Sequence, residues 1–246
     1  MSQRTHNLII LKDQSFTKNN VYIIVNKLSS SAAIIDPACD LCEITDAISR
    51  WNISLDKVLL THSHEDHIRR VNDLVALYNC DVYISKMEAD YYFYDCNNLQ
   101  LFEDEDVLNV GDTRISCLLT PGHTAGSTCF LVESELFTGD TVFIEGCGIC
   151  TGLGGSVKSM YQSVQKLKKR IDEHIKIYPA HTYGALPGCS MEYIKHNNIY
   201  FGFDEKQFVE FRMRKNQKNL FQLDKIIYVF LTIFLYLLKC PQSLIL

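Results

Sequence analysis

The stretch Thr61-His-Ser-His-Glu-Asp-His-Ile68 is the most informative part of this 246-residue chain. Four of its side chains are common metal ligands: His62, His64, Asp66 and His67. The apolar run 57–61 predicts a short buried strand, and the pattern over 68–78 predicts an amphipathic helix behind it. A loop between a strand and a helix can converge several side chains on one point, because both elements hold it rigidly. The stretch therefore predicts a metal site that holds two ions.

Three further apolar runs each end in a small or turn-forming residue and then present one potential ligand. These ligands are His123, Asp140 and His181. His123 follows the predicted strand 115–119, and His181 follows the predicted strand 175–178. One loop cannot close two metal sites, so we expect these residues to complete the constellation. The other histidines have no such context, and we expect them to be ordinary surface residues: His6, His174 and His196.

The composition excludes nucleic acid as the main partner. Hydrophobic residues make up 47% and charged residues 22%, which is typical of a globular protein, and the formal net charge is -5. Binding to nucleic acid phosphates requires a positively charged surface, which this balance does not provide. The length accommodates one large domain, or one domain with a small appendage.

The ten cysteines follow a polar N-terminus in which we recognise no signal peptide. We therefore expect reduced thiols and a cytoplasmic protein. Two pairs have Cys-x-x-Cys spacing, Cys39/Cys42 and Cys147/Cys150. A composite four-cysteine zinc site is one interpretation, but the pairs lie about a hundred residues apart and lack the flanks of a zinc knuckle. We favour buried or incidental thiols.

The periodicity of apolar residues predicts a layered α/β domain. Expected strands are 7–11, 21–25, 32–35, 58–60, 82–84, 115–119, 128–132 and 175–178. Expected helices are 41–51, 68–78, 88–94 and 159–174. Hairpin-like strands come first, and strands alternate with helices afterwards. That order favours mixed sheets covered by helices.

The C-terminal part predicts a division of the chain. We expect a catalytic domain over 1–200, a helical appendage over 201–221 and an apolar tail over 222–246. The nearly continuous apolar segment 226–238 would span ~20 Å as a helix, less than the ~30 Å hydrocarbon core of a bilayer. It has three interpretations: a helix docked on the body or on a second subunit, a membrane anchor, or a non-native end of the reading frame. We favour docking, with membrane association through the tail as the alternative.

The ligands in this order resemble the pattern of the metallo-β-lactamase-fold hydrolases, in their glyoxalase II-like branch. The resemblance covers residues 7–200 and implies a four-layer αβ/βα sandwich, with the site at one edge of two packed sheets. It also implies the ligand sets: His62, His64 and His123 for one metal, Asp66, His67 and His181 for the other, and Asp140 as the bridge.

Imidazole and carboxylate ligands suit zinc, and the resemblance implies two zinc ions per chain. Two ions ~3.5–4 Å apart can generate a metal-bound hydroxide near neutral pH and polarise the carbonyl that it attacks. Asp66 is expected to ligate one ion and to orient this nucleophile, which makes it the catalytic residue. A structural zinc cluster is the weaker interpretation, because structural sites close with four ligands and usually use thiolates.

The segment 137–150 distinguishes among branches of the family. It most resembles the zinc-dependent hydrolases encoded with bacterial trans-acyltransferase polyketide synthases. Persulfide dioxygenases and glyoxalase II usually carry an arginine where Ile149 stands, which argues against glutathione recognition. Flavodiiron-type relatives carry a glutamate where His64 stands, which argues against an oxygen-reducing di-iron site.

This resemblance implies a thioesterase that acts on acyl groups held by the phosphopantetheine arm of an acyl carrier protein. Carrier proteins are acidic, so we expect a local basic docking surface. Its candidates, each also explained as part of a solvated helix face, are Arg69, Arg70, Arg212, Arg214 and Lys215. Cys147 and Cys150 are expected to have packing roles, since a metal-bound hydroxide already supplies the nucleophile.

Three other functions stay open at this point. One is a hydroxyacylglutathione hydrolase-type enzyme for small thioesters, and another is a mononuclear iron persulfide dioxygenase. The third is a non-catalytic, metal-bound module whose tail recruits a membrane or a partner. The identity of the acyl group and the oligomeric state do not follow from the residues.

Overall fold

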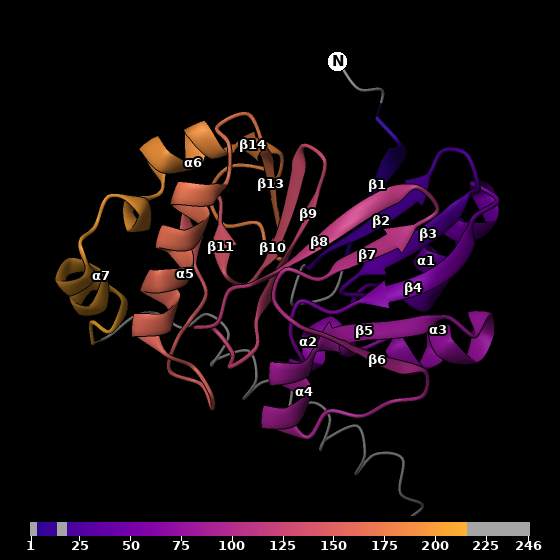
Figure 1. The fold of residues 1–246 in the computed structure, drawn as a ribbon, viewed down its shortest axis with the longest axis horizontal. Helices are drawn as coiled ribbons and strands as arrows, with labels where there is room; N and C mark the ends of the chain where they lie inside the picture. The colour runs from indigo at the N-terminus through magenta and orange to yellow at the C-terminus, as the bar shows by residue number, and fades with distance from the viewer. Residues whose placement is uncertain (1–3, 14–18, 216–246) are drawn as a thin grey trace, which may run out of the picture. The chain divides into compact units, whose positions relative to one another are not determined.

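The computed structural model describes residues 4–13 and 19–215, and two six-stranded sheets form its body (Figure 1). The first sheet contains, in chain order, β1 (His6–Lys12), β2 (Asn20–Asn26), β3 (Ser31–Ile35), β4 (Ser54–Leu59), β5 (Asp81–Ser85) and β6 (Leu99–Phe102). Strands β1 to β3 pair antiparallel, and β3 to β6 pair parallel. Parallel neighbours require crossover connections, and helices lie in all three of them.

The second sheet is mainly antiparallel. Its order is β14 (Cys189–Ser190), β13 (Lys176–Pro179), β10 (Glu135–Gly139), β9 (Thr128–Val132), β8 (Thr113–Leu119) and β7 (Val107–Val110). Only β10 and β13 pair parallel in this sheet. A small hairpin of β11 (Val142–Phe143) and β12 (Gly146–Cys147) lies beyond the end of β10. Phe143 of this hairpin lies against His181, with ring centroids 5.9 Å apart.

Helices cover the outer face of each sheet (Figure 1). The first sheet is covered by α1 (Leu41–Arg50), α3 (Val71–Tyr78) and α4 (Lys86–Tyr92). The second sheet is covered by α5 (Val157–Arg170), α6 (Met191–Asn197) and α7 (Glu205–Arg212), with a short 3-10 helix (Ile199–Phe201) between the last two. The predicted four-layer αβ/βα sandwich is therefore confirmed.

Alternating side chains explain why the layers stack in this way. Along β2, Tyr22 and Ile24 point into the cluster between the sheets, whereas Ile23 and Val25 point toward the helices of the first sheet. Along β10, Phe137 points between the sheets and Leu136 points toward α5. Strands buried on both faces read as continuous apolar runs, which is why these runs were recognisable in the sequence.

The structure confirms all eight expected strands and corrects one helix. A helix was expected over 68–78, but a short helix, α2 (Glu65–Ile68), begins earlier and α3 starts only at Val71. Arg70, between the two, has φ -108° and ψ 8°, which is not helical. Asp66 and His67 therefore lie on a helical turn and not on a loop, which holds their side chains more rigidly.

The chain divides into two units between Met213 and Arg214, and the described residues up to Met213 belong to the first. Phe208 of α7 lies in the apolar cluster that includes Met160 of α5, so this part of the expected appendage packs against the body. The expected boundaries at residues 200 and 221 stay predictions. The apolar segment 226–238 lies outside the described residues. None of the helices within residues 4–13 and 19–215 combines the length and the apolar composition that a membrane span requires.

Candidate metal centre

Four strand ends deliver the predicted ligands to one place. The stretch 61–68 follows β4, His123 follows β8, Asp140 follows β10, and His181 follows β13. Groups of three donor atoms lie within 4.8 Å of one another in three combinations: His62, His64 and His123; His62, His67 and Asp140; and Asp66, His67 and His181. The structure therefore brings all seven predicted ligands together.

The residue before Asp140 must be a glycine. Gly139 has φ +48°, a backbone conformation that is unfavourable for residues with a Cβ. A Cβ at this position would lie 2.4 Å from Oγ1 of Thr61, which directly precedes the first histidine. The absence of a side chain at Gly139 lets the end of β10 approach the loop that carries His62 and His64.

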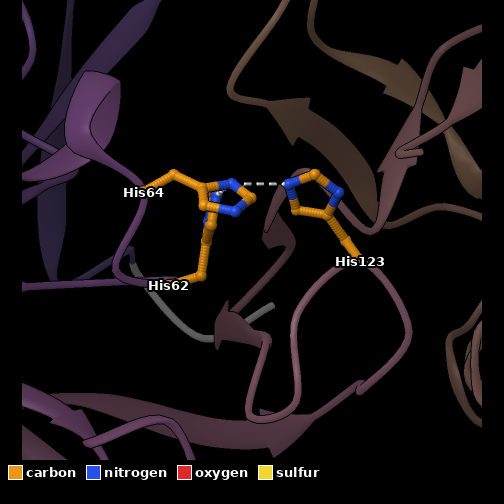
Figure 2. A group of neighbouring side chains, drawn as sticks. All are labelled: His62, His64 and His123. Atoms are coloured by element: carbon orange, nitrogen blue, oxygen red, sulfur yellow. Dashed lines mark hydrogen bonds between the residues drawn. The ribbon is translucent and has the colours of Figure 1, made fainter. Parts of the chain in front are cut away.

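Three imidazole rings converge at one side of the centre (Figure 2). Nδ1 of His64 lies 3.0 Å from Nε2 of His62 and 3.0 Å from Nε2 of His123. The rings of His62 and His64 meet edge to face, with centroids 4.6 Å apart. Each ring therefore directs one nitrogen into the same small volume, which is the arrangement that three ligands of one ion require.

A second group lies beside the first. Nε2 of His67 and Nε2 of His181 each lie 3.7 Å from Oδ2 of Asp66. Asp140 faces both groups with different oxygens. Its Oδ1 lies 3.7 Å from Nε2 of His67 and 3.4 Å from Nε2 of His181, whereas its Oδ2 lies 3.5 Å from Nε2 of His123. The carboxylate of Asp140 is thus placed between the two sets of ligands.

The outward-facing ring nitrogens have partners that hold the rings in place. Nδ1 of His67 lies 3.0 Å from Oδ2 of Asp36, and Nδ1 of His123 lies 2.8 Å from the carbonyl oxygen of Ile149. Nδ1 of His62 lies 3.0 Å from Oγ1 of Thr61. When the outer nitrogen of a histidine is hydrogen-bonded, its inner nitrogen is free to bind a metal in a defined orientation.

The residues fit a zinc centre. In the described part of the chain, two buried atoms here make no hydrogen bond, Nε2 of His67 and Oδ1 of Asp140. Buried polar atoms without partners are costly, and one cation between them would satisfy both. Ligands bound at ~2.0–2.1 Å to a shared tetrahedral ion lie about 3.4 Å apart, close to the separations observed here. The donors are imidazoles and carboxylates without thiolates, as in catalytic zinc sites.

Burial keeps part of the histidine cluster neutral. Burial and, to a smaller extent, the neighbouring His123 lower the pKa of His64 to about 4. Burial also holds the pKa of His62 well below its usual value, with His67 and His123 acting in the same direction. Neutral imidazole is the form that binds metals, so these ligands are ready at neutral pH.

His67 behaves differently because carboxylates surround it. Burial lowers its pKa, but Asp66 and Asp36 outweigh burial and raise it to about 10. For Asp140, burial opposes ionisation, yet His181 and His67 hold its pKa well below the usual range. In the metal-free protein His67 is therefore protonated at neutral pH, and a metal that binds there displaces a proton.

Sequence reasoning missed Asp36, which supports two parts of the centre. Its Oδ2 contacts His67 and accepts a hydrogen bond from Oγ1 of Thr61 at 2.6 Å, and its Oδ1 accepts one from the Thr61 backbone at 2.8 Å. The signal was present, because Asp36 directly follows β3 (Ser31–Ile35) in the same way that the predicted ligands follow their strands. Its role differs, however, because Asp36 orients a ligand and belongs to none of the candidate ligand groups.

His6 is not the surface residue that the sequence predicted. Its side chain is fully buried, and its Nε2 lies 2.6 Å from Oε2 of Glu135. His174 and His196 are exposed, as expected. His6 starts the edge strand β1, and it is buried against Glu135 of β10 and Glu133 of the turn between β9 and β10, which are distant in the sequence.

The prediction of a basic docking surface is wrong for Arg212. Arg212 is buried, and its Nε donates a hydrogen bond to the carbonyl oxygen of Gly148 at 2.9 Å. Arg69 lies 3.7 Å from Asp13, and Arg70 pairs with two acidic side chains, Asp40 at 3.5 Å and Asp73 at 3.4 Å. Arg214 and Lys215 are exposed and belong to the second unit.

The cysteine pairs do not form a composite metal site. Cys39 lies in the apolar cluster outside the first sheet, whereas Cys147 and Cys150 lie in the cluster outside the second. Among the residues that the structure describes, no candidate ligand group contains a cysteine, and the described cysteines are free thiols. Burial raises the pKa of Cys150 to about 11, which agrees with the expected packing role.

The sequence pattern of a known superfamily covers this constellation. A model described as the metallo-beta-lactamase superfamily matches residues 15–181, which include all seven candidate ligands. The chain belongs to the metallo-β-lactamase superfamily. The predicted family is confirmed by this match.

Individual members of the metallo-β-lactamase superfamily resemble the chain over most of its length. It is 47% identical to the probable polyketide biosynthesis zinc-dependent hydrolase PksB of Bacillus subtilis, covering 82% of this chain and 91% of that protein. It is 32% identical to the hydroxyacylglutathione hydrolase of Tolumonas auensis, covering 70% of this chain and 66% of that protein. A metallo-beta-lactamase from Staphylococcus aureus superposes with a TM-score of 0.79 at 25% identity, covering 87% and 69% of the two chains. These relatives confirm the predicted enzyme class, a hydrolase.

Proposed function

We propose that the chain is a zinc-dependent hydrolase with two zinc ions, and that it cleaves thioesters of acyl groups held on a carrier protein in polyketide biosynthesis. The observation that carries the binuclear part is the placement of Asp140. Its Oδ1 faces His67 and His181, and its Oδ2 faces His123. A carboxylate with one oxygen toward each ligand group is suited to bridge two ions.

The candidate ligands have separate roles in this proposal. His62, His64 and His123 would hold one ion, Asp66, His67 and His181 the other, and Asp140 both. When bound, the ions would supply Lewis acidity and lower the pKa of a water molecule. Asp66 is the most exposed carboxylate of the centre, with 28% of its side chain accessible, so it can orient the attacking water from the solvent side. The lack of thiolate ligands favours catalysis over a purely structural or binding role.

The carrier-linked substrate is supported by similarity and by one side chain. The 47% identical relative is named for polyketide biosynthesis, a process that keeps acyl groups on carrier thiols. Ile149 is half-buried, and its carbonyl oxygen contacts Nδ1 of His123, so this uncharged residue directly adjoins a predicted ligand. An arginine expected for glutathione recognition is thus replaced by an apolar residue. The carrier partner and a cytoplasmic location stay predictions.

Hydroxyacylglutathione hydrolysis is the second candidate function. It is supported by the 32% identical relative that carries this name. An acyl group on glutathione is also a thioester, so both candidates use the same bond chemistry. They differ in what binds the thiol side of the substrate, because glutathione presents two carboxylates that require cationic partners.

The test combines metal analysis with two substrates. Purified protein is assayed for zinc and iron, and hydrolysis is measured on an acyl-carrier protein and on an S-acyl glutathione. We expect two zinc ions and turnover of the carrier-linked substrate, lost in Asp66→Asn. Turnover confined to the glutathione thioester would favour the second function. A single iron with oxygen uptake on a persulfide, or metal without turnover, would overturn the proposal.

A further inference from the structure

Helix α4 begins with a capping pattern whose glutamate has an unusual partner. Oγ of Ser85 accepts a hydrogen bond from the backbone nitrogen of Glu88 at 3.1 Å, which caps the helix. In a Ser-x-x-Glu pattern the glutamate side chain usually returns to the backbone of the capping serine. Here the carboxylate of Glu88 instead contacts two loops that carry metal ligands.

The two oxygens of Glu88 are divided between these loops. Oε1 accepts hydrogen bonds from the backbone nitrogen of Ser63 at 2.9 Å and from its Oγ at 2.8 Å. Oε2 accepts a hydrogen bond from the backbone nitrogen of Gly126 at 2.8 Å. Ser63 lies between His62 and His64, and Gly126 lies three residues after His123. One side chain therefore joins the loops that supply the three-histidine group.

Burial makes this contact specific. Glu88 has no exposed surface, and a buried carboxylate is costly unless several donors stabilise its charge. Three donors do so here. The loop also approaches the helix closely, because a Cβ at Gly126 would lie 2.2 Å from the backbone nitrogen of Glu88, and Oγ of Ser85 donates to the Gly126 carbonyl at 2.7 Å.

We propose that Glu88 is a positioning residue that sets the distance between the His62–His64 loop and the His123 loop. It thereby holds Nδ1 of His64 3.0 Å from Nε2 of His123. The inference rests on the proposed zinc centre and adds a residue that belongs to none of the candidate ligand groups. His67 of the other group has its own support in Asp36, whereas the contacts of Glu88 are to the loops of the three-histidine group, so we expect Glu88 to act mainly on that group.

The decisive variant is Glu88→Gln. Glutamine has the same shape but offers one acceptor oxygen and one NH₂ group. Its NH₂ group would therefore face the backbone N–H of either Ser63 or Gly126, and that hydrogen bond would be lost. The matched control is Glu205→Gln, which removes the same charge from the first turn of α7 at an exposed position. Zinc affinity of the folded proteins is measured by competition with a chelator, and urea unfolding is measured without metal.

We expect one of the two zinc ions to bind about 10–100-fold more weakly in Glu88→Gln, and both to bind normally in the control. In a His181→Ala background, where the three-histidine group remains, the remaining zinc should show the same loss. Ser63→Ala removes only the hydroxyl contact with Glu88, so its loss of zinc affinity should be smaller. This variant provides the test if Glu88→Gln does not fold.

Unchanged zinc affinity in a folded Glu88→Gln or Ser63→Ala protein would overturn this inference, even if unfolding occurs at lower urea. Equal weakening of both ions would overturn its selectivity. A wild-type protein that binds no zinc would overturn the proposed function itself, so the two failures are distinguishable.

Discussion

Nε of Arg212 donates a hydrogen bond to the carbonyl oxygen of Gly148 at 2.9 Å, and this contact ties α7 to the metal centre. The backbone nitrogen of Gly148 donates to the carbonyl oxygen of Asp140 at 3.0 Å. The next carbonyl, that of Ile149, contacts Nδ1 of His123. The buried guanidinium of Arg212 therefore supports the segment 148–149. This segment contacts the ring of His123 and the backbone of Asp140.

This relationship changes the prediction for Arg212. We expect Arg212→Met to lower the free energy of unfolding by about 1–3 kcal/mol, because the Gly148 carbonyl loses a buried donor. Turnover should fall equally on carrier-linked and small thioesters. The control is Lys206→Met on the exposed side of the same helix. Urea unfolding and assays on both substrates provide the test, and a loss restricted to the carrier-linked substrate would restore a docking role.

Asp140 should be needed for both ions. Because its two oxygens face different ligand groups, Asp140→Ala is expected to lose zinc at both and to abolish measurable turnover. Zinc content after dialysis, measured beside Asp46→Ala on the exposed face of α1, tests this. Retention of two equivalents of zinc would rule out the bridging role.

Asp36 should affect metal binding without being a ligand. Asp36 has φ +47°, a conformation that asparagine tolerates, so Asp36→Asn preserves the backbone. The substitution removes the charge that orients His67, and we expect zinc affinity to fall about 10–100-fold. Chelator competition on Asp36→Asn and on the control Asp46→Asn measures it. An affinity within twofold of wild type would contradict the orienting role.

The metal-free protein should lose stability as the pH rises above neutral. The pKa of His67 is about 10 in the folded protein and 6.5 in a model peptide, so the folded state binds the extra proton between these values. This contribution is fully present below the unfolded pKa and is lost as the pH approaches the folded pKa. Urea midpoints at about pH 7 and about pH 8, where the thiols of the unfolded chain are still mostly protonated, should decrease in wild type and much less in His67→Gln.

A metal that occupies the centre should remove most of this pH dependence, because it replaces the proton on His67. The same urea midpoints are measured after zinc is restored. An equally steep pH dependence with zinc bound would show that another group controls stability in this range.

Several features could be predicted from local patterns because they need no knowledge of distant contacts. A ligand within a few residues of the end of an apolar strand is recognisable in the sequence, and this rule located His123, Asp140 and His181. The same rule would have found Asp36. The rule fails for Glu88, whose sequence context indicates only a helix cap, and for Arg212, whose context indicates a solvated helix face.

The sequence by itself determined the superfamily, the layered fold and the ligand types, because these depend on periodicity and on the order of short motifs along the chain. Only the tertiary structure decided which groups support the ligands. Burial of His6, Glu88 and Arg212 arises from contacts with residues on other elements, and such contacts leave no periodic trace in the sequence. The metal centre is therefore recognisable from its ligands, whereas its rigidity depends on polar groups that only the packed sheets and helices bring together.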